Sequence, residues 1–102
     1  MEPSNSNYKI EITSLKKFGE NWQGQVKIND KYDHVITIDP PYHKSNQSRS
    51  LNENHAKDIL LWSIDFLLKR EPPAAILPEF NLSKINDYFP EFDKEIKNIY
   101  DR

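Results

Sequence analysis

A long apolar segment between Ser50 and Pro73 constrains the fold more than any other part of the chain. Its start, Ser50-Leu51-Asn52-Glu53, matches a capping box, in which the serine hydroxyl accepts a hydrogen bond from a backbone N–H one turn later. Pro72-Pro73 ends the segment, because proline lacks a backbone N–H and clashes with the preceding turn. We therefore predict one long helix, whose apolar residues cover most of its circumference: Ala56, Ile59, Leu60, Leu61, Ile64, Phe66, Leu67 and Leu68.

The polar side of this predicted helix is narrow and carries an aromatic residue. Asp58, Asp65 and Lys69 form the polar strip, and Trp62 falls beside them on a helical wheel. We expect the C-terminal segment to cover the indole. The alternative is that the indole anchors a partner protein. The interface predicted in that case consists of Trp62, Leu61, Leu68 and Trp22.

Three segments near the N-terminus alternate apolar and polar residues with the period of two that is typical of half-buried strands. They run from Tyr8 to Thr13, from Trp22 to Ile28 and from Asp33 to Ile38. Asn29-Asp30 joins the second segment to the third, since Asn and Asp tolerate positive φ in hairpin turns. These short connections predict an antiparallel meander of three or four strands.

Prolines divide the C-terminal third into short helical pieces. Pro73 suits the first position of a helical turn over Ala74–Leu77, and Asn81 suits the cap of a helix over Leu82–Phe89. A final amphipathic helix is predicted over Phe92–Tyr100. The apolar residues of this third are expected to pack back onto the sheet or the long helix: Ile76, Leu77, Phe80, Leu82, Ile85, Phe89 and Phe92.

Strands first and helices second favour an α+β fold, with one long central helix and two or three short C-terminal helices against one face of the sheet. We predict a single domain over residues 8–102, preceded by a disordered tail over residues 1–7.

Composition excludes several classes of function. The chain of 102 residues contains no cysteine, which excludes disulfides, thiol catalysis and thiolate zinc sites. Its net charge of −2 gives no general attraction to nucleic acid or anionic membranes. Residues 1–7 lack the apolar core of a signal peptide, and no apolar run approaches the ~20 residues that span a bilayer. We therefore expect a cytoplasmic protein without membrane contact.

The histidines and carboxylates form no recognisable catalytic or metal-binding motif. His34, His43 and His55 lack the spacing of known metal sites, and Asp58 and Asp65 lie on the solvated strip of the long helix. We assign no catalytic, cofactor-binding or metal-binding residue. A small enzyme is an alternative if the fold gathers a histidine and a carboxylate in one pocket.

Asp39-Pro40-Pro41-Tyr42 follows the third predicted strand and is similar to the Asp-Pro-Pro-Tyr signature of adenine-N6 DNA methyltransferases. In that family the motif holds the target amino group, and the aromatic ring stacks on a flipped base. The family also uses a glycine-containing cofactor loop. This chain has only Gly19 and Gly24, and neither leads from a strand into a helix. We interpret the segment as a strand end followed by a stiff turn.

Basic residues are concentrated in the N-terminal half. Lys16, Lys17, Lys27, Lys44 and Arg49 are the candidates for contact with DNA or RNA. Acidic residues are interleaved with them, so we favour a mixed, solvated sheet face. The alternative is an antitoxin-like regulator. The order of elements is faintly similar to that of HicB-type antitoxins, which pair a small antiparallel sheet with one helix.

Two stretches of the second half carry a resemblance. Phe66-Leu67-Leu68-Lys69-Arg70-Glu71-Pro72 is followed by Phe80-Asn81-Leu82-Ser83 and by Tyr88-Phe89-Pro90-Glu91. This pattern resembles a group of small, uncharacterised bacterial proteins, with Asn81 standing where the pattern has Asp. The resemblance implies a bacterial source and no particular activity.

These patterns together favour a non-enzymatic protein-binding or accessory module of a bacterial cytosolic system. Its expected partner is another protein or a second copy of the chain, since exposed aromatic residues around a modest core are typical of homodimers. Nucleic acid is the less favoured partner, and no cofactor is expected.

Overall fold

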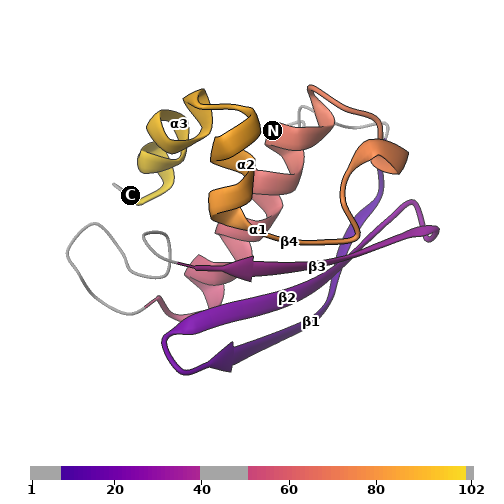
Figure 1. Ribbon diagram of the computed structural model, residues 1–102. Helices are drawn as coiled ribbons and strands as arrows, with labels where there is room; N and C mark the ends of the chain where they lie inside the picture. Colours follow the sequence, from indigo (N-terminus) through magenta and orange to yellow (C-terminus); the bar gives the residue numbers. More distant parts are fainter. Residues whose placement is uncertain (1–7, 40–50, 101–102) are drawn as a thin grey trace.

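The computed structural model describes residues 8–39 and 51–100 and shows an α+β fold, in which the helices cover one face of a sheet (Figure 1). The predicted fold class is confirmed. The tail predicted over residues 1–7 lies outside the described residues. In chain order the elements are β1 (Ile10–Phe18), β2 (Asn21–Ile28), β3 (Tyr32–Ile38), α1 (Glu53–Leu68), the 3₁₀ turn η1 (Pro73–Ala75), β4 (Glu79–Asn81), α2 (Leu82–Tyr88) and α3 (Glu91–Tyr100). Of the helices in these two ranges, none combines the length and the apolar character needed to cross a membrane.

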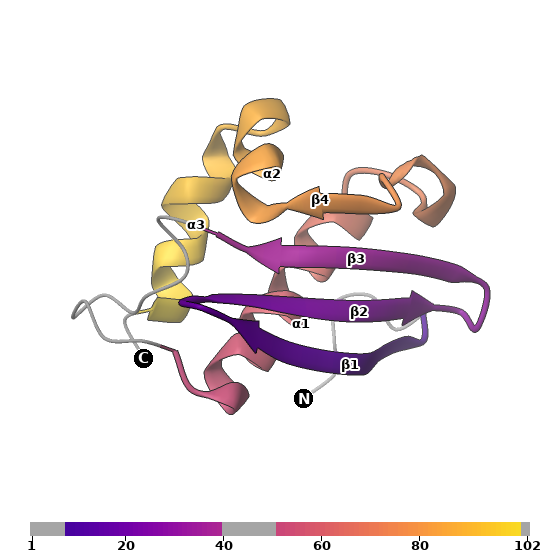
Figure 2. The same cartoon turned by 60° about the horizontal axis from the view of Figure 1, so that its bottom comes forward.

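The sheet is mixed, with strand order β1-β2-β3-β4 (Figure 2). Its first three strands form the predicted antiparallel meander, in which Trp22 pairs with Ile38 and Ile28 with Tyr32. A fourth strand exists, but β4 runs parallel to β3, so the antiparallel direction predicted for a fourth strand is wrong. The reason is the connection: α1 forms the long crossover that a parallel pair requires.

β1 extends beyond the predicted end at Thr13 because it contains a bulge. Its pairing with β2 shifts between Ile12 and Ser14, and the Thr13 hydroxyl donates to the backbone carbonyl of Gln25 at 3.2 Å. The extra residue reverses the alternation of faces, so that Leu15 pairs with Gly24 on the side of the helices. The strict period of two therefore stops at Thr13, although the strand continues.

The hairpin predicted at Asn29-Asp30 is confirmed, because both residues have φ of 56°. This turn also holds the chain just before β1. The Lys9 N–H donates to the Asn29 side chain at 2.8 Å, and the Asn29 N–H donates to the Lys9 carbonyl at 2.7 Å. The Lys9 ammonium lies 3.2 Å from the Asp30 carboxylate. The hydrogen bond between these two groups, together with their opposite charges, raises the pKa of Lys9 and lowers the pKa of Asp30.

α1 begins later than the predicted capping box. The N-cap is Asn52, whose side chain accepts from the His55 N–H at 2.7 Å, so the prediction of Ser50 as the cap is wrong. Asparagine caps a helix as well as serine does, and it places Leu51 in the core instead of in the first turn. Ser50 itself lies outside the described residues. The helix ends at Leu68, before the predicted proline stop.

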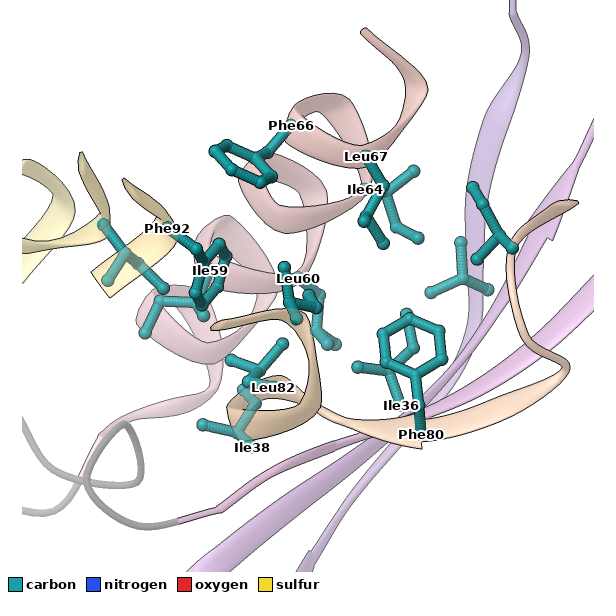
Figure 3. Packing of buried hydrophobic residues seen from close by; sticks show 14 of the residues in the cluster. Ile36, Ile38, Ile59, Leu60, Ile64, Phe66, Leu67, Phe80, Leu82 and Phe92 are labelled. Atoms are coloured by element: carbon teal, nitrogen blue, oxygen red, sulfur yellow. The ribbon is translucent and has the colours of Figure 1, made fainter. Parts of the chain in front are cut away.

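α1 packs directly onto the sheet at Gly24. A Cβ atom at this position would overlap with Cδ1 of Leu60, so the absent side chain is what allows the close approach. Leu60 and Ile64 point from α1 toward the sheet, whereas Phe66 points toward α3 (Figure 3). All three side chains are buried in one hydrophobic cluster with Ile36 of β3.

The C-terminal third packs back onto the core as predicted, with one clear exception. Ile76, Phe80, Leu82, Ile85 and Phe92 are buried, and Phe89 is half-buried. Leu77 is 44% exposed, so its predicted burial is wrong. The backbone at Ile76 is extended, and neighbouring side chains in an extended chain point in opposite directions. Because Ile76 occupies the core, Leu77 points outward.

The contact at Gly24 gives a first prediction. Gly24→Ala should destabilise the protein by about 1–3 kcal/mol, because the added methyl group must displace the buried Leu60 side chain. Gln25→Ala is the matched control, since Gln25 is exposed on the other face of β2, and it should change stability by no more than about 0.5 kcal/mol. Chemical denaturation measures both. Equal effects of the two substitutions would contradict this account of the helix–sheet contact.

The Lys9–Asp30 pair gives a second prediction, for pH dependence. Lys9 keeps the folded-state pKa of Asp30 below the ordinary value of 3.8, so the pair stabilises the fold above that value and stops doing so as the pH falls through the lowered pKa. Lys9→Gln should return the Asp30 pKa toward 3.8, as measured by NMR titration of its carboxyl carbon. The difference between variant and parent should shrink in high salt, because the pair is exposed. An unchanged Asp30 titration in Lys9→Gln would rule out the coupling.

Candidate functional site

The interface residues predicted from the sequence do not form one exposed patch. Trp62 is half-buried, and its ring centroid lies 5.7 Å from that of Phe92 on α3. Leu61 is 37% exposed. Leu68 and Trp22 are buried in the core of the chain, which leaves little of either side chain for a partner. The C-terminal segment therefore covers Trp62 in part, as expected.

The described basic residues do not converge on one surface. Lys16 and Lys17 are exposed neighbours on β1, so their side chains project from opposite faces of the sheet. Lys27 lies 3.6 Å from the carboxylate of Asp33 on the adjacent strand, which balances its charge. The other two predicted contacts, Lys44 and Arg49, lie outside the described residues.

The two described histidines lie on different elements. His34 is buried on β3, and its Nδ1 lies 2.7 Å from the carbonyl of Leu77, which can only accept. We therefore assign the hydrogen to Nδ1, and Nε2 is buried without a partner among the described residues. His55 lies in the first turn of α1, and His43 is outside the described residues. Residues 8–39 and 51–100 contain no group of three side chains suited to hold a metal ion.

Asp39, the first residue of the Asp-Pro-Pro-Tyr segment, caps α2, although it lies far from α2 in the sequence. Its carboxylate accepts from the backbone N–H of Ser83 at 3.2 Å and from the Ser83 hydroxyl at 2.6 Å. Asn81 occupies the predicted N-cap position, but its side chain makes no cap hydrogen bond. Asp39 thus serves as a structural cap at the end of β3. Residues 40–42 lie outside the described residues.

A half-open apolar groove of about 450 Å³ lies between the end of α1, the segment from η1 to β4, and α2. Leu67 of α1, Phe80 of β4 and Ile85 of α2 line it. Leu77 and Tyr88 also line it and are 44% and 61% exposed, so both stand at its mouth. This groove is an apolar hollow on the described surface that is open to a ligand, and we treat it as the candidate site.

Residues of β3 and of the end of α1 hold the walls of this groove in place. His34 binds the Leu77 carbonyl on one wall, and Asp39 binds Ser83 at the start of α2 on the other. Arg70 lies 3.6 Å above the Phe66 ring, and its guanidinium lies 3.2 Å from Glu91 of α3. The groove is therefore bounded by elements that are tied to the core.

The sequence patterns did not identify this groove. The sequence predicts burial for all the apolar residues of the segment after α1, and therefore gives no reason to place Leu77 at the surface. A usable signal was the pair Pro72 and Pro78, which turn the chain twice within a short apolar stretch. Such a stretch forms no long regular element, and some of its apolar side chains are left at the surface.

No known family model matches the chain, and searches of curated proteins and of solved structures gave no significant match. The resemblance to small bacterial proteins and the similarity to antitoxins therefore stay predictions. The groove is the feature of the molecule that bears on function.

The capping of α2 by Asp39 gives a third prediction. Asp39→Ala should lower the free energy of unfolding by about 0.5–2 kcal/mol, because the first turn of α2 loses its acceptor. Ser83→Ala should cost less, since the backbone N–H keeps its partner. The double substitution should cost less than the sum of the two single ones, because both remove the same interaction. Denaturation of the four proteins measures this cycle. Additive losses would show that Asp39 and Ser83 act independently.

Proposed function

We propose that the protein is a non-enzymatic, protein-binding module of the bacterial cytoplasm, which holds a short apolar stretch of a partner protein in this groove. The observation that carries the proposal is the pair of exposed side chains, Leu77 and Tyr88, at the mouth of an apolar hollow. Large apolar side chains gathered on a surface mark interaction sites more often than isolated ones do.

The size of the groove supports this proposal. Its volume of about 450 Å³ falls in the range of ligand sites, yet the groove is half-open, whereas small-molecule sites enclose most of their ligand. A longer chain suits it better, because only the inserted side chains need to be enclosed. Each fully buried Leu-sized side chain contributes about 1.5–3 kcal/mol before the cost of association.

The chemistry of the lining also favours binding over catalysis. Among the described residues of the lining, the charged ones are Glu71 and Lys84, and the others are apolar or aromatic. Neither of the two described histidines belongs to it. General acid–base chemistry needs a titratable group beside the reacting atom, whereas apolar side chains provide packing contacts.

A peptide selection tests this proposal. Random peptides displayed on phage are selected on the immobilised wild-type protein and on Leu77→Glu, which places a charge at the mouth of the groove. Phe18→Glu is the matched control, because Phe18 is 57% exposed and lies at the end of β1, away from the groove. Peptides enriched on the wild type should bind Phe18→Glu equally well and Leu77→Glu about tenfold or more weakly.

Calorimetry on the enriched peptides measures these affinities. Leu77 is largely exposed and its backbone carbonyl is unaltered, so Leu77→Glu should keep its fold, which circular dichroism checks. Failure to enrich any peptide on the wild type, or equal binding by Leu77→Glu, would refute the groove as a protein-binding site.

A further inference from the structure

The groove is bordered by a strand whose outer edge is unpaired within the described part of the chain. β4 ends the strand order of residues 8–39 and 51–100, so β3 is its one neighbour there (Figure 2). The Val35 N–H donates to the Pro78 carbonyl at 2.8 Å, and Val35 is in register with Glu79. In a parallel ladder, alternate residues direct both backbone groups to the same neighbour. Phe80 therefore directs its N–H and C=O toward β3, and Glu79 directs its own outward.

A second, smaller hollow of about 190 Å³ follows this edge. Glu79, Phe80 and Asn81, three consecutive residues of β4, all line it. Successive side chains of a strand point to opposite faces, so a hollow that touches all three lies along the edge of the strand. It shares Phe80 and Leu77 with the apolar groove, which makes the two hollows neighbours on one surface.

Carboxylates that have no ion-pair partner in the described part of the chain border both hollows. Glu71 lines the groove, and Glu79 and Asp87 line the smaller hollow. None of the three forms an ion pair with another described residue. Among the described residues of the two linings the one cation is Lys84, whose ammonium lies 5.6 Å from the Tyr88 ring centroid. The surface around the groove is therefore acidic and complements a basic partner.

We infer that the partner binds as an extended segment that pairs with the outer edge of β4 and becomes a fifth strand. Every second side chain of such a strand faces the helices, as Phe80 does, and enters the apolar groove. The side chain between two of these inserted side chains lies on the opposite face of the sheet, beside Glu79. A Lys or Arg is favoured at that position. The segment recognised is thus apolar–basic–apolar in an extended conformation.

Because β4 is short, a partner segment needs side-chain contacts in addition to backbone pairing. β4 spans Glu79–Asn81, and a strand of this length offers few outward backbone groups. Short edge strands resist indiscriminate pairing. The backbone bonds orient the partner, and the groove and the carboxylates select its sequence. The described surface thereby combines backbone pairing, which any extended segment can make, with a groove that selects particular side chains.

This inference rests on the proposed function, and its test uses the peptides selected above. The enriched sequences should share the apolar–basic–apolar alternation. Replacing their basic residue by Glu should weaken binding by up to about fivefold. Methylating the backbone nitrogen that pairs with Glu79 should weaken binding by about tenfold with every side chain kept. Methylation at the neighbouring, outward nitrogen is the matched control and should have little effect.

Hydrogen exchange followed by NMR provides a readout on the protein. The amides of Glu79 and Asn81 should become protected when a peptide binds, whereas Phe80, already paired with β3, should change little. Glu79→Pro removes the outward N–H and should weaken binding by about tenfold. Glu79→Gln keeps this N–H and should lose only the preference for a basic residue.

The outcomes separate the two proposals. Peptides that need Leu77 but bind as helices, or tolerate backbone methylation, would overturn the strand pairing and leave the groove as a binding site. If Glu79→Pro fails to fold, peptide methylation and amide protection still decide. Protection of Glu79 in the protein alone, together with a dimeric mass by light scattering, would assign the edge to a second copy and overturn the choice of partner.

Discussion

The close approach of α1 to the sheet at Gly24 is the contact on which the other layers depend. Since no side chain stands at this position, Leu60 lies directly against the strand, and the helix buries one full side. The opposite side of α1 then receives α3, where the rings of Phe66 and Phe92 are 5.2 Å apart. α1 also forms the crossover connection between β3 and β4, so that β4 pairs with β3 in parallel. The position of the groove follows from the point at which α1 ends.

β3 connects this core to the candidate site. It is an interior strand, and it carries two polar groups whose partners come from the C-terminal third. His34 holds the Leu77 carbonyl before β4, and Asp39, just after β3, holds Ser83 on α2. Both interactions join residues far apart in the sequence, and each fixes one wall of the groove. A partner would therefore meet walls that are already ordered, which lowers the conformational entropy lost on binding.

Much of the fold was predictable because its signals are local. The positive φ at Asn29 and Asp30 and the alternation along β2 and β3 each depend on residues within a few positions of one another. The predicted N-cap of α1 was wrong because the local sequence offers two suitable capping residues. Ser50 and Asn52 are both good caps by residue type, and the structure uses Asn52, with Leu51 buried in the core.

The sequence alone determined the α+β class, the antiparallel meander, the long apolar helix, and the absence of cysteine chemistry. Periodicity and backbone preferences act within each segment, and they do not need the rest of the chain. The tertiary structure decided the parallel pairing of β4, the cap from Asp39, the exposure of Leu77 and hence the groove. A strand as short as Glu79–Asn81 has too few residues to show a period. Its direction, its free edge and the hollow beside it arise only when α1 brings distant segments together.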